Sequence, residues 1–115
     1  MADIGTGLWR MRLKMVQPGT EQPLDEYRRT FRHLQSVWDV LQEAGYTIQD
    51  HTDQPFDIGM DLKVITYEQK QGLQREVVSE TIKPSIYYQR EGKTWLLQMG
   101  EVIVATPEDE ELLKP

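Results

Sequence analysis

The sequence predicts an α+β protein with an N-terminal strand, one long amphipathic helix and then a small all-β module of about six short strands. Three observations lead to this prediction. Apolar and charged side chains alternate over residues 9–15, which is typical of a strand with one buried face. Apolar residues then repeat with helical spacing over residues 24–41. After residue 45 the chain consists of short apolar runs separated by turn signals.

Length and composition limit the possible functions. With 115 residues, 38% of them hydrophobic, the chain is expected to form a single domain, residues 1–115, with a modest core. The sequence has no cysteine, which excludes disulfides, a thiolate nucleophile and Cys-ligated zinc. No apolar run approaches the roughly 18 residues of a membrane span, and no signal-peptide core is visible. We therefore expect a cytoplasmic protein with no membrane partner.

The negative charge is concentrated in the second part of the chain. The net charge is -6, and the acidic excess lies within residues 46–115. Nucleic-acid binding needs clustered Lys and Arg. The N-terminal part carries two basic groups, which we interpret as solvated faces: Arg10, Arg12 and Lys14, and then Arg28, Arg29 and Arg32. We expect no nucleic-acid partner.

The strand and a following loop are predicted within residues 1–22. The side chains expected on the buried face of the strand are Trp9, Met11, Leu13 and Met15. A turn-forming run at residues 17–20 ends the strand.

The long helix is predicted over residues 23–44. Pro23 suits its first turn, and Gly45 follows where a left-handed C-cap is expected. Its apolar stripe has spacings of three and four and consists of Leu24, Tyr27, Phe31, Leu34, Trp38 and Leu41. A helix of this kind must dock on another surface. Two surfaces remain open, namely the rest of the same chain or the helix of a second copy in a homodimer.

The β-module is predicted over residues 45–106 and is followed by an acidic tail, residues 107–115. Glu91 and Gly92 predict a tight hairpin turn between two strands. Phe56 is expected to fill the core of the module, and Asp57 to cap a turn through its backbone. Trp95 and Leu97 are also expected in the core.

The sequence offers no catalytic set and no metal site. His33 is predicted on the helix surface and His51 in a loop, so they do not form a ligand pair. Asp50, Asp53 and Asp57 lack the spacing of a calcium loop. No nucleophile elbow, phosphate-binding glycine loop or dinucleotide fingerprint is present. We expect a protein that is not an enzyme and binds no cofactor or metal.

Several segments of the second half together carry a resemblance to a known family. They are Ala44-Gly45-Tyr46-Thr47-Ile48, then Gln54-Pro55-Phe56-Asp57, then Met60 and Val64, and finally Leu96-Leu97-Gln98-Met99-Gly100-Glu101-Val102-Ile103-Val104. In this order and at these intervals they resemble the β-domain of GrpE, the nucleotide exchange factor of the bacterial Hsp70 chaperone DnaK. The resemblance covers residues 34–106.

Some positions depart from the family pattern. Family members have a much longer N-terminal helix that pairs with a partner subunit, and they have no counterpart of the predicted N-terminal strand. The proline expected after Asp57 is Ile58, and the arginine of the Leu-Arg-x-Ala motif, which faces the chaperone, falls on Gln98. A Gly-Tyr pair is replaced by Ser85-Ile86-Tyr87-Tyr88. These departures indicate a divergent relative with a dedicated Hsp70-like or actin-like ATPase as its partner.

The resemblance implies an exchange factor or regulatory subunit that binds and opens the nucleotide-binding domain of an Hsp70-family ATPase. The partner-binding residues that it implies are Gly45, Phe56, Asp57, Leu97, Gln98 and Met99. Gly45 is equally well explained as a helix C-cap, and Gln98 as a neutral surface amide. The alternative function is a GrpE-fold adaptor or assembly module without exchange activity, which the absence of the arginine and of the long helix both favour.

Overall fold

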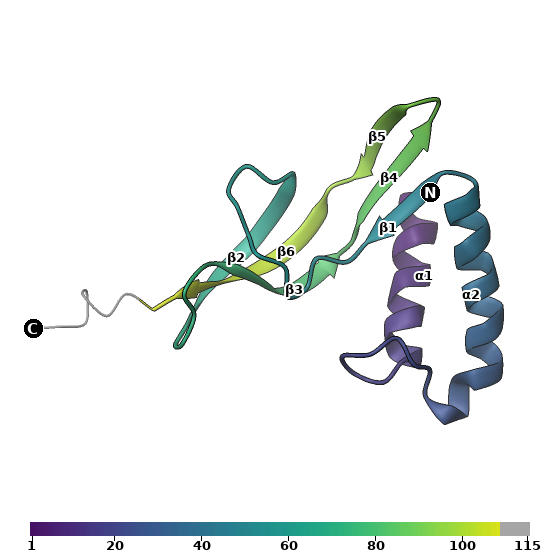
Figure 1. The fold of residues 1–115 in the computed structure, drawn as a ribbon, viewed down its shortest axis with the longest axis horizontal. Coiled ribbons are helices and arrows are strands. Elements are labelled where there is room, and N and C mark those ends of the chain that lie inside the picture. The colour runs from purple at the N-terminus through teal and green to yellow at the C-terminus, as the bar shows by residue number, and fades with distance from the viewer. Residues whose placement is uncertain (109–115) are drawn as a thin grey trace, which may run out of the picture. The chain divides into compact units, whose positions relative to one another are not determined.

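The computed structural model describes residues 1–108, which form two α-helices, a short 3-10 helix and six β-strands. The elements are labelled along the chain in Figure 1. The chain divides into two compact units. The first unit consists of Met1–Ile48 and Ile86–Gln98, and the second of Gln49–Ser85 and the chain from Met99 onward. The single domain predicted for residues 1–115 stays a prediction.

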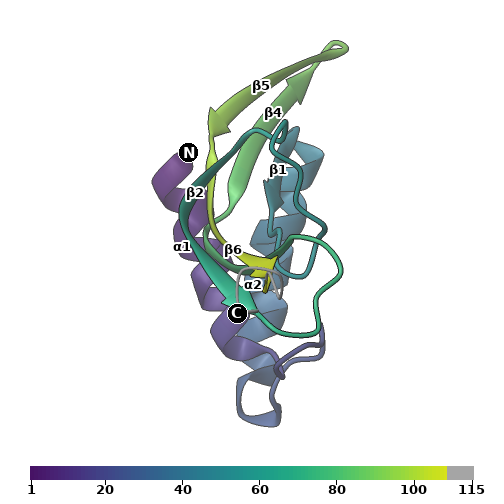
Figure 2. The same cartoon turned by 90° about the vertical axis from the view of Figure 1, so that its left-hand side faces the viewer.

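Two helices form one part of the first unit. Helix α1 (Ala2–Met15) is followed by a loop, the 3-10 helix η1 (Asp25–Tyr27) and helix α2 (Arg28–Glu43). The two α-helices run antiparallel side by side (Figures 1 and 2). Val16 forms a β-bridge with Pro23 between them, and the guanidinium group of Arg12 on α1 lies 5.2 Å from the ring centre of Trp38 on α2.

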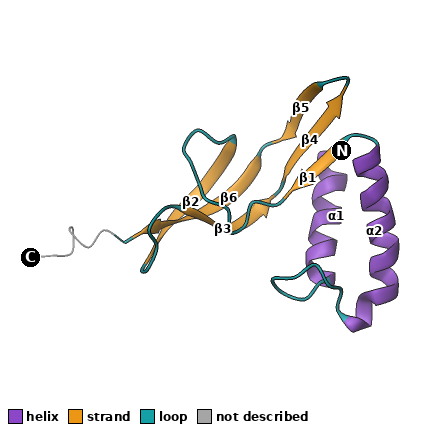
Figure 3. Cartoon of the chain, in the orientation of Figure 1, coloured by secondary structure: helices purple, strands orange, loops and turns teal. Residues whose placement is uncertain are grey.

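The predicted N-terminal strand is wrong, because residues 9–15 are the second half of α1. The protein is α+β, but its order is helix, helix and six strands (Figure 3). Met11 and Leu13, which were expected on a buried face, are exposed. The buried face of α1 has helical spacing and includes Gly5, Trp9 and the half-buried Arg12. Because this face contains small and cationic residues, the sequence shows no apolar stripe with helical spacing. The alternation at residues 9–15 therefore predicted a strand where the chain is helical.

Helix α2 buries the predicted stripe within the same chain. Leu34 and Trp38 are buried, whereas the other stripe residues are half-buried or, in the case of Tyr27, exposed. Trp38 lies in a core cluster that also contains Trp9, Ile48 and Ile86. The stripe therefore docks on α1 and on the adjoining sheet, and it is not a free surface.

A three-stranded sheet completes the first unit. It contains β1 (Tyr46–Gln49), β4 (Ser85–Arg90) and β5 (Lys93–Gln98) in the order β1-β4-β5. Strands β4 and β5 are antiparallel, and their turn has positive φ at both Glu91 (52°) and Gly92 (76°). The predicted hairpin is thus confirmed, with the backbone that a two-residue turn of type I′ requires.

The second unit has its own three-stranded sheet. It contains β2 (Leu62–Lys70), β3 (Val77–Lys83) and β6 (Gly100–Pro107) in the order β2-β6-β3. The central strand β6 is parallel to β2 and antiparallel to β3. Phe56 is buried in the core of this unit with Val78, Val102 and Val104, which confirms the prediction for Phe56. The predicted acidic tail begins inside β6, and its residues 109–115 lie outside the described chain.

Candidate functional site: the exposed strand β5

Strand β5 is an edge strand with exposed apolar side chains. It pairs with β4 on one side, and its other side has no strand partner among residues 1–108. Trp95, Leu96 and Leu97 follow one another in β5 and are 46%, 39% and 43% exposed. Soluble proteins usually protect or charge such an edge, so three consecutive large apolar residues here indicate a binding surface. We call these three residues the β5 surface.

The exposure of Trp95 and Leu97 corrects the prediction that they lie in the core. The sheet contributes to the core of the first unit through Ile48 of β1 and Ile86 of β4. Strand β5 lies beyond β4, and all of its residues up to Leu97 are exposed. A strand buries its alternate residues only where another part of the protein covers that strand. The alternation of residues in the sequence does not show which strands are covered.

The hairpin geometry directs backbone groups of β5 toward the open edge. Arg90 and Lys93 flank the two-residue turn and form a hydrogen-bonded pair, after which bonded and non-bonded pairs alternate. The backbone N–H and C=O groups of Thr94 and Leu96 therefore point away from β4. These groups are available to an added strand from a partner, a common mode of peptide recognition.

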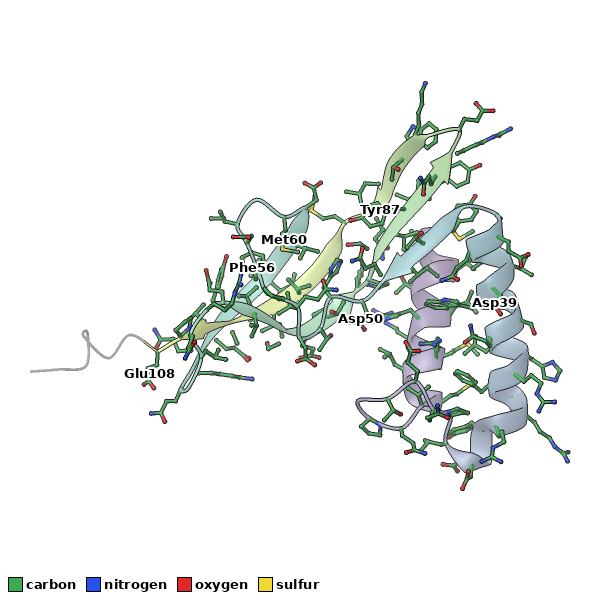
Figure 4. The ribbon with its side chains drawn as sticks, viewed as in Figure 1. Asp39, Asp50, Phe56, Met60, Tyr87 and Glu108 are labelled. Atoms are coloured by element: carbon green, nitrogen blue, oxygen red, sulfur yellow. The ribbon has the colours of Figure 1, made fainter. Side chains whose placement is uncertain are left out.

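A β-bulge lies within the β5 surface. Gln98 pairs with Ile86 and Leu96 with Tyr87, so Leu97 is an extra residue without a partner in β4. Bulges re-aim side chains and are frequent next to functional sites. The Trp95 ring stacks on Tyr88 of β4 with 5.7 Å between ring centres, which holds it in place on the sheet. The hairpin and its projecting side chains are visible in Figure 4.

The residues that the resemblance assigned to partner binding fall in both units. Gly45, Leu97 and Gln98 lie in the first unit. Gly45 has a φ of 102°, which confirms the positive φ expected of the C-cap, and its N–H donates to the carbonyl oxygen of Gln42. The Gln98 amide nitrogen donates a 2.9 Å hydrogen bond to Thr6 Oγ1 on α1. The Gln98 side chain is therefore hydrogen-bonded within its own chain.

Phe56, Asp57 and Met99 lie in the second unit. Phe56 is buried, whereas Asp57 and Met99 are exposed. The carbonyl oxygen of Asp57 accepts the N–H of Met60, which closes the turn through the backbone. Phe56 and Met60 both lie against the sheet of this unit (Figure 4).

The second unit also contains a buried Ser–His pair that the sequence did not reveal. Ser85 Oγ lies 2.7 Å from His51 Nε2, and it accepts the N–H of Gly100. His51 Nδ1 lies 3.2 Å from the side-chain oxygen of Gln54. Because that oxygen only accepts, the matching tautomer has the proton on Nδ1, and the Ser85 hydroxyl donates to Nε2. Ser85 and His51 are both buried, so no substrate reaches the hydroxyl and the pair has a structural role.

Ser85→Ala is expected to lower the free energy of unfolding of the second unit by about 1–3 kcal/mol, because His51 Nε2 and the Gly100 N–H would both lose their buried partner. Urea denaturation would measure the change. Ser79→Ala is a matched control, because the Ser79 hydroxyl is only part-buried and donates to one backbone carbonyl. Equal stability losses for the two variants would contradict the role of the buried pair.

The described residues offer no site for a metal or a membrane span. No group of three or more His, Asp and Glu side chains among them is placed to hold a metal ion. In the loop considered for calcium, Asp50 Oδ1 already accepts the N–H of Thr52 and the hydroxyl of Thr81. Neither described helix has both the length and the apolar character that crossing a membrane requires.

Comparison with known proteins gives no relative. No family model matches the sequence, no curated protein resembles it significantly, and no solved structure resembles the fold significantly.

Proposed function

We propose that this chain is a GrpE-like regulatory subunit that binds an Hsp70-family ATPase, or a related actin-like ATPase, in the cytoplasm. The observation that carries the proposal is the β5 surface. Leu97 begins the segment that resembles the chaperone-facing Leu-Arg-x-Ala motif of GrpE, and it is exposed together with Trp95 and Leu96. A partner-binding role for this segment thus has support both from the resemblance and from its exposure.

The order of elements is consistent with the proposal. Helix α2 ends at Glu43 and is followed by Gly45 and a short strand, and the Phe56-Asp57 turn precedes strand β2. The chain closes with the β4–β5 hairpin and the valine-rich strand β6. This is the outline of the segments on which the resemblance rests.

The proposed mechanism is a shift in the conformational equilibrium of the partner. A protein that binds the open form of a nucleotide-binding domain more tightly than the closed form weakens nucleotide binding by the same factor. Couplings of this kind are typically about 5–150-fold. The β5 surface would contribute the apolar contact, and the Thr94 and Leu96 backbone groups would contribute hydrogen bonds at the edge.

The test is release of labelled ADP from the purified Hsp70-family and actin-like ATPases of the source organism. We expect the chain to accelerate release from one of them, and Leu97→Glu to weaken binding at least tenfold, because a charge would replace an apolar contact. Ile65→Glu is the matched control, since Ile65 is also an exposed apolar strand residue but lies in β2. Failure to bind any of these ATPases would overturn the proposal.

The adaptor without exchange activity is a second candidate, which the Gln98 contact favours. The resemblance assigns a partner-facing arginine to this position, but the Gln98 amide bonds to Thr6 of its own chain. A charge-assisted contact to the partner is therefore missing. Binding to the ATPase that depends on Leu97 but leaves ADP release unchanged would favour the adaptor.

A further inference from the structure

The first unit has a hollow on the surface of helix α2. Its volume is about 390 Å³. Small-molecule sites typically have volumes of roughly 300–1,000 Å³. The lining includes Pro23 of the preceding loop and, on α2, Arg28, Phe31, Arg32, Gln35 and Asp39. All of these residues belong to the first unit, and none belongs to the β5 surface. We call this place the α2 hollow.

The side chain of Arg12 on α1 lies beside the α2 hollow. Its guanidinium group is 5.7 Å from the ring centre of Phe31, and its Nε donates a 3.4 Å hydrogen bond to Gln35 Oε1. The Gln35 amide nitrogen donates in turn to Asp39 Oδ1 at 2.9 Å, which orients the amide. The half-buried guanidinium group is therefore held by the aromatic rings of α2 and by one amide. A donor that is already in place lowers the entropy cost of binding a ligand.

Two of the cations at the α2 hollow have no carboxylate partner. Arg28 forms a 2.7 Å ion pair with Asp25. In the described part of the chain, no carboxylate lies within ion-pairing distance of Arg12 or Arg32. A guanidinium group has five N–H donors, and the bond to Gln35 uses only the Nε–H of Arg12. The Nη groups of Arg12 and the whole guanidinium group of Arg32 can therefore donate to an anion.

We propose that the α2 hollow binds a phosphate monoester that carries a small aromatic group. Such an ester has a charge of about −1.5 to −2 at pH 7, which matches the two unpaired charges of Arg12 and Arg32. Guanidinium groups bind phosphate oxygens through paired hydrogen bonds, which gives geometric specificity as well as energy. Pro23 and Phe31 supply apolar surface for the aromatic group. This inference is independent of ATPase binding.

The charges of the lining also orient the ligand. Arg32 lies in the first half of α2, and Asp39, which is labelled in Figure 4, lies seven residues further on. Seven residues correspond to about 10 Å along the helix axis. The phosphate group is therefore bound near Arg32 and kept away from the Asp39 carboxylate. A hydroxyl or amino group at the other end of the ligand would donate a hydrogen bond to Asp39.

The test is isothermal titration calorimetry of the full chain with phenyl phosphate at pH 7.5. We expect saturable binding and a Kd at least about tenfold higher for Arg32→Gln, because one of the two unpaired charges is lost. Arg29→Gln is the matched control, since it removes the same charge from an exposed neighbouring position that does not line the α2 hollow. It should leave the Kd within about twofold of the wild type. Both arginines are exposed, so both variants should keep the wild-type melting temperature.

Arg12→Lys tests the guanidinium group separately from its charge. The variant keeps the positive charge but loses the planar arrangement of donors, so we expect a Kd at least about fivefold higher. Because Arg12 packs on Phe31 and Trp38, circular dichroism is needed to show that this variant folds. Arg32→Gln carries the test if it does not.

Three further probes define the ligand chemistry. Benzoate keeps the ring but has a single charge, and inorganic phosphate has the charge but no ring, so both should bind more weakly than phenyl phosphate. A peptide that contains phosphotyrosine presents the same group on a protein segment. Tighter binding of this peptide than of phenyl phosphate would identify a phosphorylated protein as the source of the ligand, and equal binding would identify a small phosphate ester.

Three results would overturn this inference. One is the absence of saturable binding of phenyl phosphate up to millimolar concentration. Another is an equal loss of affinity in Arg32→Gln and Arg29→Gln, because the attraction would then be a general effect of positive charge. The third is benzoate binding as tight as that of phenyl phosphate. None of these results bears on ATPase binding, which is measured with a different partner and with Leu97→Glu.

Discussion

Replacing Gly45 with Asp is expected to lower the free energy of unfolding of the first unit by about 2–3 kcal/mol. Gly45 has a φ of 102°, a conformation that costs a residue with a side chain about 1–2 kcal/mol. A Cβ at this position would also meet the carbonyl oxygen of Gln89. Moving that strand away would break the 2.9 Å bond between the Gln89 N–H and the Gly45 carbonyl, which contributes about 1 kcal/mol.

Urea denaturation of Gly45→Asp would test this expectation, and Gly59→Asp is the matched control. Gly59 lies in an exposed turn, where an added Cβ would have no neighbour within 4 Å. A folded Gly45→Asp variant as stable as Gly59→Asp would contradict the packing described here.

The result also bears on partner binding, because loss of binding in an unfolded Gly45→Asp variant would not identify a contact residue. Leu97→Glu is the better test, since Leu97 is exposed and pairs with no residue of β4.

Local signals in the sequence predicted α2 and the strands well. The stripe at residues 24–41 has a helical period, and Leu34 and Trp38 are indeed its buried members. The strands are short and end at residues such as Pro84 and Gly92, whose backbone constraints appear directly in the sequence. The predicted helix began too early, because residues 25–27 form the 3-10 helix η1 rather than the first turn of α2.

Helix α1 was mispredicted because its partner determines which of its faces is buried. Gly5 allows the helix to approach Ile86, and Arg12 lies over the rings of Phe31 and Trp38. A glycine and an arginine give no apolar period, while Ile4 and Met11 remain exposed. The packing of α2 thus overrides the local pattern of α1.

The candidate site was predicted only in part, because its main features depend on contacts between distant segments. The resemblance pointed to Leu97, but the exposure of the β5 surface follows from the place of β5 at the sheet edge. The Ser85–His51 pair joins residues 34 positions apart, and no spacing rule connects them. Thr6, 92 positions from Gln98, is its hydrogen-bond partner. Such contacts arise from the tertiary fold.

Trp38→Ala is expected to lower the free energy of unfolding of the first unit by about 3–5 kcal/mol. Trp38 is buried against Trp9, Ile48 and Ile86, and its ring lies under the Arg12 guanidinium. Its removal leaves a cavity at the point where both helices and the sheet meet. A small protein has only about 5–15 kcal/mol of stability, so a large part of the first unit's stability would be lost.

Val40→Ala is the control for this change, because Val40 is on the same helix but exposed, and its truncation should alter stability by less than about 0.5 kcal/mol. Urea denaturation followed by the fluorescence of the remaining Trp9 and Trp95 would compare the variants. Measurement at a concentration where the wild type is monomeric separates the core from self-association. If Trp38→Ala lost no stability there and only weakened a dimer, Trp38 would belong to a seam between copies, and the packing of α2 on α1 within one chain would be wrong.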